Sequence, residues 1–220
     1  MKPIHTTPLI AWTALAVAAA QLFTTATASA AGYKMADKVG ASIAEFREEI
    51  VNIKKEVDVT MSALDKIVTT ATSDPRKAFK DFDKAVPQID DAAKKAKKRG
   101  ADIKERGQAY FQAWEKELAG VSNAEIRQLA EERKAKLQAT FGNIKTSMEP
   151  VRDQFIGWLA NLKDLQKYLR NDLTIGGIDA AKELIGKAKT EGQGVQQSMD
   201  KVIAELNTIV ATLTPAKAKK

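Results

Sequence analysis

The 220-residue chain contains no cysteine and only one histidine, His5. Without thiols it can form no disulfide, iron–sulfur cluster or thiolate zinc site, and it has no cysteine nucleophile. His5 lies in a segment that we expect to be removed, so the mature chain offers no imidazole for Ser-His-Asp catalysis or for metal binding. Aromatic residues are also scarce, at 6%. We therefore expect no enzyme, no metal, no cofactor and no small-molecule substrate.

Apolar and charged residues are abundant instead. The chain is 44% hydrophobic and 29% charged, with 35 basic residues against 28 acidic ones and a net charge of +7. These values fit a helical protein of one or two domains, but they do not indicate which ligand it binds.

The first 30 residues have the pattern of a secretory signal peptide. Lys2 supplies a positive charge, and residues 9–23 form an apolar run that is shorter than the roughly 20 residues needed to cross a bilayer. Small residues place cleavage after Ala30, with Ala28 as the second candidate, and an uncleaved membrane anchor is the alternative interpretation. No cysteine follows the run, which excludes a lipid anchor. We predict export to the periplasm, where a chain without cysteine cannot form wrong disulfides.

Glycine and proline divide the rest of the chain into four segments in which apolar residues recur at steps of three and four. This spacing places them on one face of a helix, and the sequence has no alternating pattern that would predict a strand. Caps are expected from Asp74, from a Ser122–Glu125 capping box and from Thr174. The predicted helices are residues 36–71, 75–119, 124–172 and 175–213.

Short connections between long helices force sequence neighbours to run antiparallel. The sequence therefore predicts an all-α fold, an elongated antiparallel four-helix bundle or coiled coil. We divide the chain into a signal peptide (1–30), one helical coiled-coil domain (31–213) and a basic tail (214–220) that we expect to be disordered.

Counting outward from the turns predicts which residues of neighbouring helices face each other. The count places Gly100 opposite Phe141, and it places Gly192 near Phe155 and Trp158. A small residue opposite a large one is how a narrow bundle accommodates aromatic side chains.

The second and third predicted helices are longer than the first and fourth. Their connecting turn should therefore project about ten residues, or about 15 Å, beyond the other two helices. One interpretation is a self-contained tip in which the aromatic residues pack on Ile126 and Leu129. The other is an exposed apolar end that binds a partner. The candidate tip residues are Tyr110, Phe111, Trp114, Leu118, Ile126 and Leu129.

A dense basic run lies on the second predicted helix. It is a candidate patch for an anionic lipid surface, lipopolysaccharide or nucleic acid, although such runs are more commonly ordinary solvated helix faces. Nucleic acid is disfavoured because no aromatic residues are interleaved for base stacking. The run comprises Lys94, Lys95, Lys97, Lys98 and Arg99.

Five short motifs lie along the chain: residues 33–40 (YKMADKVG), 113–118 (AWEKEL), Ser122-Asn123 with Arg127, 148–151 (MEPV) and 168–173 (YLRNDL). Together these motifs resemble an uncharacterised family of bacterial envelope proteins, domain of unknown function 2959. The resemblance implies an exported, predominantly helical, coiled-coil-like protein of unknown activity. Members of that family often carry a lipoprotein cysteine and a basic pair after the glycine equivalent to Gly40, and many are acidic; this chain has none of these features.

Together these observations favour a non-enzymatic structural or protein-interaction component of the periplasm or envelope. Its partner would be an unknown envelope protein or a second copy of the chain. The alternative is a peripheral binder of anionic lipid, lipopolysaccharide or nucleic acid through the basic helix face.

Overall fold

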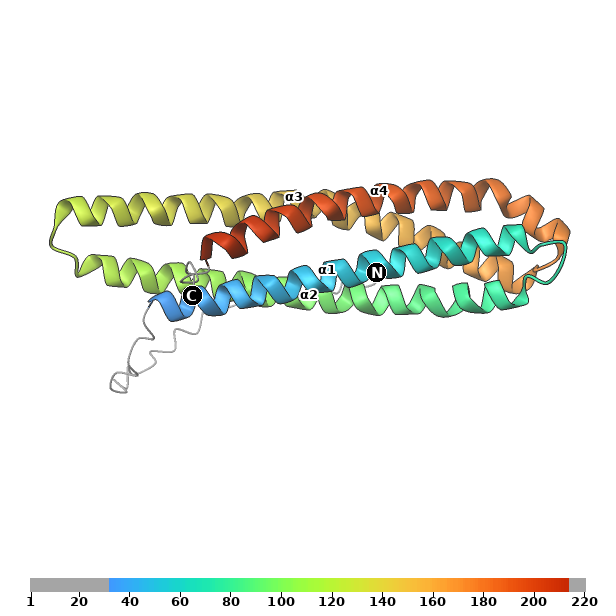
Figure 1. The fold of residues 1–220 in the computed structure, drawn as a ribbon, viewed down its shortest axis with the longest axis horizontal. Helices are drawn as coiled ribbons and strands as arrows, with labels where there is room; N and C mark the ends of the chain where they lie inside the picture. Colours follow the sequence, from blue (N-terminus) through green and yellow to red (C-terminus); the bar gives the residue numbers. More distant parts are fainter. Residues whose placement is uncertain (1–31, 214–220) are drawn as a thin grey trace, which may run out of the picture.

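The computed structural model describes residues 32–213, which form four helices joined by short turns (Figure 1). This part of the chain contains no strand, and the predicted all-α fold is confirmed. The predicted signal peptide and basic tail lie outside the described residues. The helices are α1 (Gly32–Thr69), α2 (Arg76–Ala119), α3 (Ala124–Asn171) and α4 (Ile175–Leu213).

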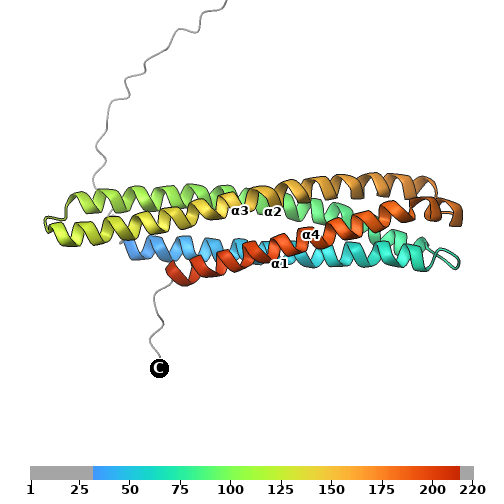
Figure 2. The ribbon, with the colours of Figure 1, turned by 90° about the horizontal axis from the view of Figure 1, so that it is seen from above.

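The helices pack as an elongated antiparallel bundle (Figures 1 and 2). Each helix contacts its neighbour in sequence, and α1 and α4 also pack together to close the bundle. Because α3 has 48 residues, the rod extends for about 70 Å at 1.5 Å per residue. The predicted elongated bundle is therefore confirmed.

The seam residues of all four helices form one continuous hydrophobic core. Ile43, Phe82, Leu162 and Ile185, one from each helix, are almost completely buried. Burial of such a side chain stabilises the fold by about 1.5–3 kcal/mol. Thr60 is the one buried polar residue in the described part of the chain, and its hydroxyl donates to the Glu56 carbonyl oxygen at 2.7 Å.

Local sequence determines where α2 and α4 begin. The Asp74 carboxylate accepts a hydrogen bond from the Arg76 backbone N–H at 3.1 Å. The Thr174 hydroxyl accepts one from the Gly177 backbone N–H at 3.1 Å. Both residues therefore satisfy backbone donors in the first turn of a helix, as predicted.

The predicted capping box at the start of α3 is wrong. Asn123, not Ser122, caps this helix, because its side-chain oxygen accepts from the Ile126 backbone N–H at 3.1 Å. The extended backbone of Asn123 directs its own side chain over the first turn, so Ser122 lies one residue too early and the Ser122–Glu125 pair does not form.

The register between α2 and α3 also differs from the prediction. A Cβ atom on Gly107, not on Gly100, would meet Phe141, at 3.2 Å, whereas Gly100 lies beside Phe46 of α1. Helical side chains lean toward the N-terminus of their own helix. Phe141 therefore leans toward the α2–α3 turn and meets a residue closer to that turn than counting along the backbone indicates.

Candidate functional site

The α2–α3 hairpin projects beyond the end of α4 (Figures 1 and 2). The Arg133 guanidinium donates to the Thr212 carbonyl oxygen at 3.2 Å, so α4 ends beside Arg133. The nine residues of α3 that precede Arg133, residues 124–132, therefore have no part of α4 beside them. At 1.5 Å per residue this projection is about 14 Å long, which agrees with the prediction. We call residues 110–133 the tip.

Helix α1 covers part of the tip, although the α2–α3 hairpin projects beyond the start of α1 as well (Figures 1 and 2). Helix α1 begins at Gly32, four residues before the predicted start, and a Cβ atom on Gly32 would lie 3.4 Å from the Glu117 carboxylate. Helix α1 therefore reaches the last part of α2, and the longer opening lies on the side where α4 stops.

The aromatic residues of the tip pack mainly on one another. The ring centroid of Tyr110 lies 5.3 Å from that of Phe111 and 5.5 Å from that of Trp114. Phe111 in turn meets Phe141 of α3 edge-on, with centroids 5.5 Å apart. Tyr110 and Leu118 are buried, while Phe111 and Trp114 are half-buried. These four predicted tip residues therefore stabilise the hairpin.

The other two predicted tip residues, Ile126 and Leu129, lie in solvent. Their exposed fractions are 55% and 68%. They precede Arg133 by seven and four residues, so all three residues lie on one face of α3. Farther along the rod, this face of α3 packs against α4. Ile126, Leu129 and Arg133 form what we call the α4-side strip.

Charges are distributed unevenly along this strip. Glu125 lies at the end nearest the turn, and Lys136 lies at the end nearest the rod. Both side chains are exposed, and neither forms an ion pair with any residue between 32 and 213. Glu132 is engaged within its own helix, since its carboxylate accepts from the Gln128 amide at 3.0 Å.

The basic run on α2 is partly neutralised by neighbouring carboxylates. Lys94 lies 3.0 Å from the Asp91 carboxylate, and Arg99 pairs with Glu45 of α1. One of the 35 basic residues precedes residue 32 and three follow residue 213, while all 28 acidic residues lie between them, so residues 32–213 carry a net charge of only +3. The members of the run that are exposed and lack an ion pair within these helices are Lys95, Lys97 and Lys98.

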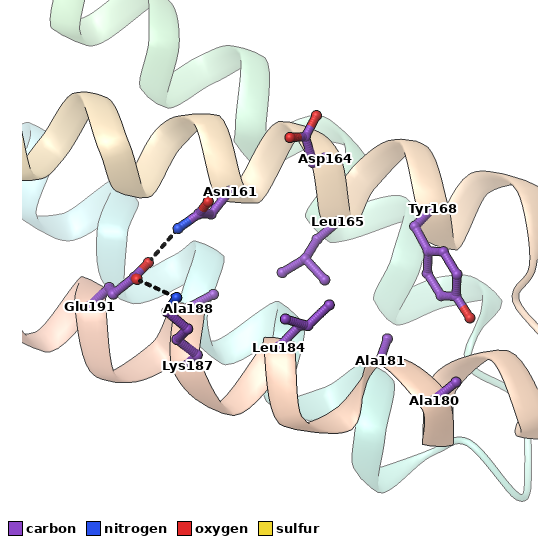
Figure 3. Close-up of a pocket in the computed structure, with 10 residues that line it drawn as sticks. All are labelled: Asn161, Asp164, Leu165, Tyr168, Ala180, Ala181, Leu184, Lys187, Ala188 and Glu191. Carbon is purple, nitrogen blue, oxygen red and sulfur yellow. Dashed lines mark hydrogen bonds and ion pairs between the residues drawn. The ribbon is translucent and has the colours of Figure 1, made fainter.

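A groove of about 420 Å³ lies between α3 and α4, toward their connecting turn (Figure 3). Leu165 and Leu184 point toward each other across it, and Leu184 is 58% exposed. The Tyr168 hydroxyl donates to the Gly177 carbonyl oxygen at 3.1 Å near one end. At the other end the Asn161 amide donates to the Glu191 carboxylate at 2.8 Å.

Sequence reasoning missed this groove. The available signal was Leu184, a large apolar residue off the apolar stripe of its helix. Apart from Leu165 and Leu184 the lining offers small alanines and polar groups that mostly bond to one another, so the groove brings together no nucleophile and base. No cluster of three or more metal-ligating carboxylates or imidazoles occurs within the described helices.

The comparisons with known proteins identify a family but no specific activity or ligand. Residues 25–213 match the family described as "Protein of unknown function (DUF2959)". No curated protein and no solved structure matches the chain. Within residues 32–213, no helix is both long and apolar enough to cross a membrane. The match covers most of the chain, in agreement with the short motifs noted above, and the chain belongs to the DUF2959 family.

Proposed function

We propose that the chain is a non-enzymatic, exported interaction component of the bacterial envelope, in which a helical rod presents its tip to another protein. The observation that carries this proposal is the exposure of Ile126 and Leu129 at the projecting end. Single exposed apolar residues are ordinary on protein surfaces. Two on one helix face, at an end of the bundle that α4 does not cover, favour a docking surface.

Site-specific photo-crosslinking in intact cells tests this proposal. A photoreactive residue at position 129 should crosslink to a protein. The same residue at position 156 is the matched control, because Ile156 is 57% exposed on the same helix but lies away from the tip. Equal crosslinking from both positions, or none from position 129, would contradict docking at the tip.

Export is tested separately by cell fractionation and by the mass of the purified protein. We expect the protein in the periplasmic fraction, with an N-terminus that follows Ala30 or Ala28. A full-length protein retained in the membrane fraction would favour the uncleaved anchor instead.

The three lysines without partners support a second candidate function, binding to an anionic surface. Reversal of Lys95, Lys97 and Lys98 to Glu should then abolish binding to phosphatidylglycerol vesicles at low salt, and physiological salt should weaken the binding of the wild-type chain. A control with the same change in charge reverses three other exposed lysines, Lys55, Lys182 and Lys201. Equal loss of binding in both variants would indicate a response to net charge and not a specific patch.

A further inference from the structure

We propose that the partner of the α4-side strip is a second copy of this chain. The tips of the two copies would overlap in antiparallel orientation. The first turns of α3 in one copy would then pack beside α3 of the other copy, at the position that α4 of that copy does not reach. This inference rests on the proposed function, in which the tip docks a protein, and it adds the identity of that protein.

The geometry of the projection is self-complementary. Residues 124–132 of α3 extend past the end of α4 beside Arg133, and they are also the residues that an overlapping copy would insert. The uncovered length and the inserted length are therefore equal. A two-fold arrangement satisfies both copies at once and closes the interface, since each copy supplies the helix that the other lacks.

The spacing of the strip is that of a helix–helix seam. Ile126, Leu129 and Arg133 follow one another at steps of three and four residues, and the same alternation extends to Lys136. In an antiparallel pair with its two-fold axis close to Leu129, the Leu129 side chains of the two copies would pack against each other, and Ile126 of each copy would lie beside Arg133 of the other. Ile126 and Leu129 would then leave solvent, and the α3–α4 interface would continue as an α3–α3 interface.

The charges select the antiparallel orientation. Glu125 marks the turn end of the strip, whereas Arg133 and Lys136 mark its rod end. Antiparallel overlap places the acidic end of one strip beside the basic end of the other, twice by symmetry, whereas parallel overlap would place like charges together. Glu132, near the middle, remains bonded to Gln128 of its own helix.

The size of the interface limits its strength. About two helical turns per copy bury less than the roughly 800 Å² per partner that stable complexes typically use. We therefore expect a reversible dimer with a dissociation constant above about 1 µM.

Disulfide trapping gives a direct test because the native chain contains no cysteine. A disulfide forms when two Cα atoms approach to about 7 Å or less, a condition that positions close to a two-fold axis meet. The processed Leu129→Cys protein should form a covalent dimer under mild oxidation at least tenfold faster than Ile156→Cys. Equal rates for the two variants would overturn the proposal.

Sedimentation equilibrium tests the charge pairing without a crosslink. Glu125→Lys should weaken the dimer at least tenfold, and the added change Lys136→Glu should restore it, because the swap recreates opposite charges across the interface. Circular dichroism checks that each variant is folded. A chain that stays monomeric up to about 100 µM, or a dimer unaffected by Leu129→Ser, would overturn the proposal.

The outcomes at position 129 also separate this inference from the proposed function. A photo-crosslink from position 129 to a different envelope protein, with no self-dimer, would overturn the inference and leave docking at the tip intact. Protection of the Leu129→Cys thiol only by phosphatidylglycerol vesicles would overturn both.

Discussion

Gly192 of α4 lies directly against the indole of Trp158 of α3. A Cβ atom at position 192 would stand 3.2 Å from the indole nitrogen and 2.6 Å from the sulfur of Met61 in α1. The indole N–H donates to the buried Ala188 carbonyl at 2.8 Å, which fixes the ring in place. Three helices therefore meet around a residue that has no side chain to displace them.

Gly192→Ala should destabilise the protein by about 1–3 kcal/mol, because the added methyl group must displace the Met61 side chain and also crowds the Trp158 indole. Gly194→Ala is the matched control, since a Cβ atom at position 194 meets nothing within 4 Å. The control should be neutral or stabilise by up to about 1 kcal/mol, because alanine is the better helix former. Urea unfolding followed by circular dichroism measures both, and equal effects would contradict the packing argument.

The contact between Gly192 and Trp158 was predictable, and the one between Gly107 and Phe141 was not. Counting residues outward from a turn predicts a true neighbour of Gly192, whereas it assigns Phe141 the wrong partner, Gly100. Near the α3–α4 turn, a prediction that named both Phe155 and Trp158 was wide enough to include the true partner of Gly192. Across α2 and α3 the contact lies seven residues closer to the turn than the count places it. The lean of the side chains accounts for part of this shift, and a count along the backbone does not include it. The turn itself spans residues 120–123, so its centre also lies later than the Gly120-Val121 point from which the count begins.

The helix ends could be predicted from local chemistry because Asp74 and Thr174 act on backbone groups only two or three residues away. The exposure of Ile126 and Leu129 depends instead on where α4 ends beside α3. That position is set by contacts between residues distant in sequence, such as Arg133 and Thr212, so local sequence leaves two interpretations open.

The α3–α4 groove combines a buried floor with an exposed edge, which gives a paired prediction. Leu165, on the floor, is 6% exposed, and Leu165→Ala should cost about 2–5 kcal/mol as a cavity forms. Leu184, on the edge, is 58% exposed, and Leu184→Ala should change the free energy of unfolding by no more than about 0.5 kcal/mol. Urea unfolding measures both, and a large loss for Leu184→Ala would show that its side chain supports the bundle.

Asp90 should contribute stability that is lost in acid. Its carboxylate lies 3.1 Å from Lys94 of the same helix and 3.2 Å from Lys163 of α3. The hydrogen bond from Lys94, assisted by Lys163, lowers the pKa of Asp90. The pKa of an aspartate in the unfolded chain is about 3.9. A carboxyl group whose pKa is lower in the folded state stabilises the fold fully above the unfolded pKa, and this contribution is lost as the pH falls through the folded pKa.

The thermal midpoint of Asp90→Asn should therefore lie below that of the wild-type chain at neutral pH, and the two should converge as the solution is acidified below about pH 4. Asp153→Asn is the control, because within residues 32–213 Asp153 pairs only with its sequence neighbour Arg152. A difference between Asp90→Asn and the wild type that does not change with pH would show that the carboxylate charge is not responsible.

Tyr110 should make the tip sensitive to alkali. Burial in the aromatic cluster raises the pKa of its hydroxyl; the Arg133 guanidinium opposes this rise and the Glu117 carboxylate adds to it. The pKa of a tyrosine in the unfolded chain is about 10. Because the folded pKa of Tyr110 lies above this value, its contribution to stability is complete below the unfolded pKa. It is lost as the pH rises through the folded value.

Tyr110→Phe isolates this residue, because phenylalanine keeps the ring in the cluster and removes the group that ionises. The difference in tyrosinate absorbance between the wild-type chain and Tyr110→Phe should titrate above about pH 10, and the variant should retain more helix at high pH. Every other ionisable group is the same in both proteins, so its contribution cancels in the comparison. A difference titration at or below about pH 10 would mean that the ring meets water freely and that the aromatic cluster does not close the tip.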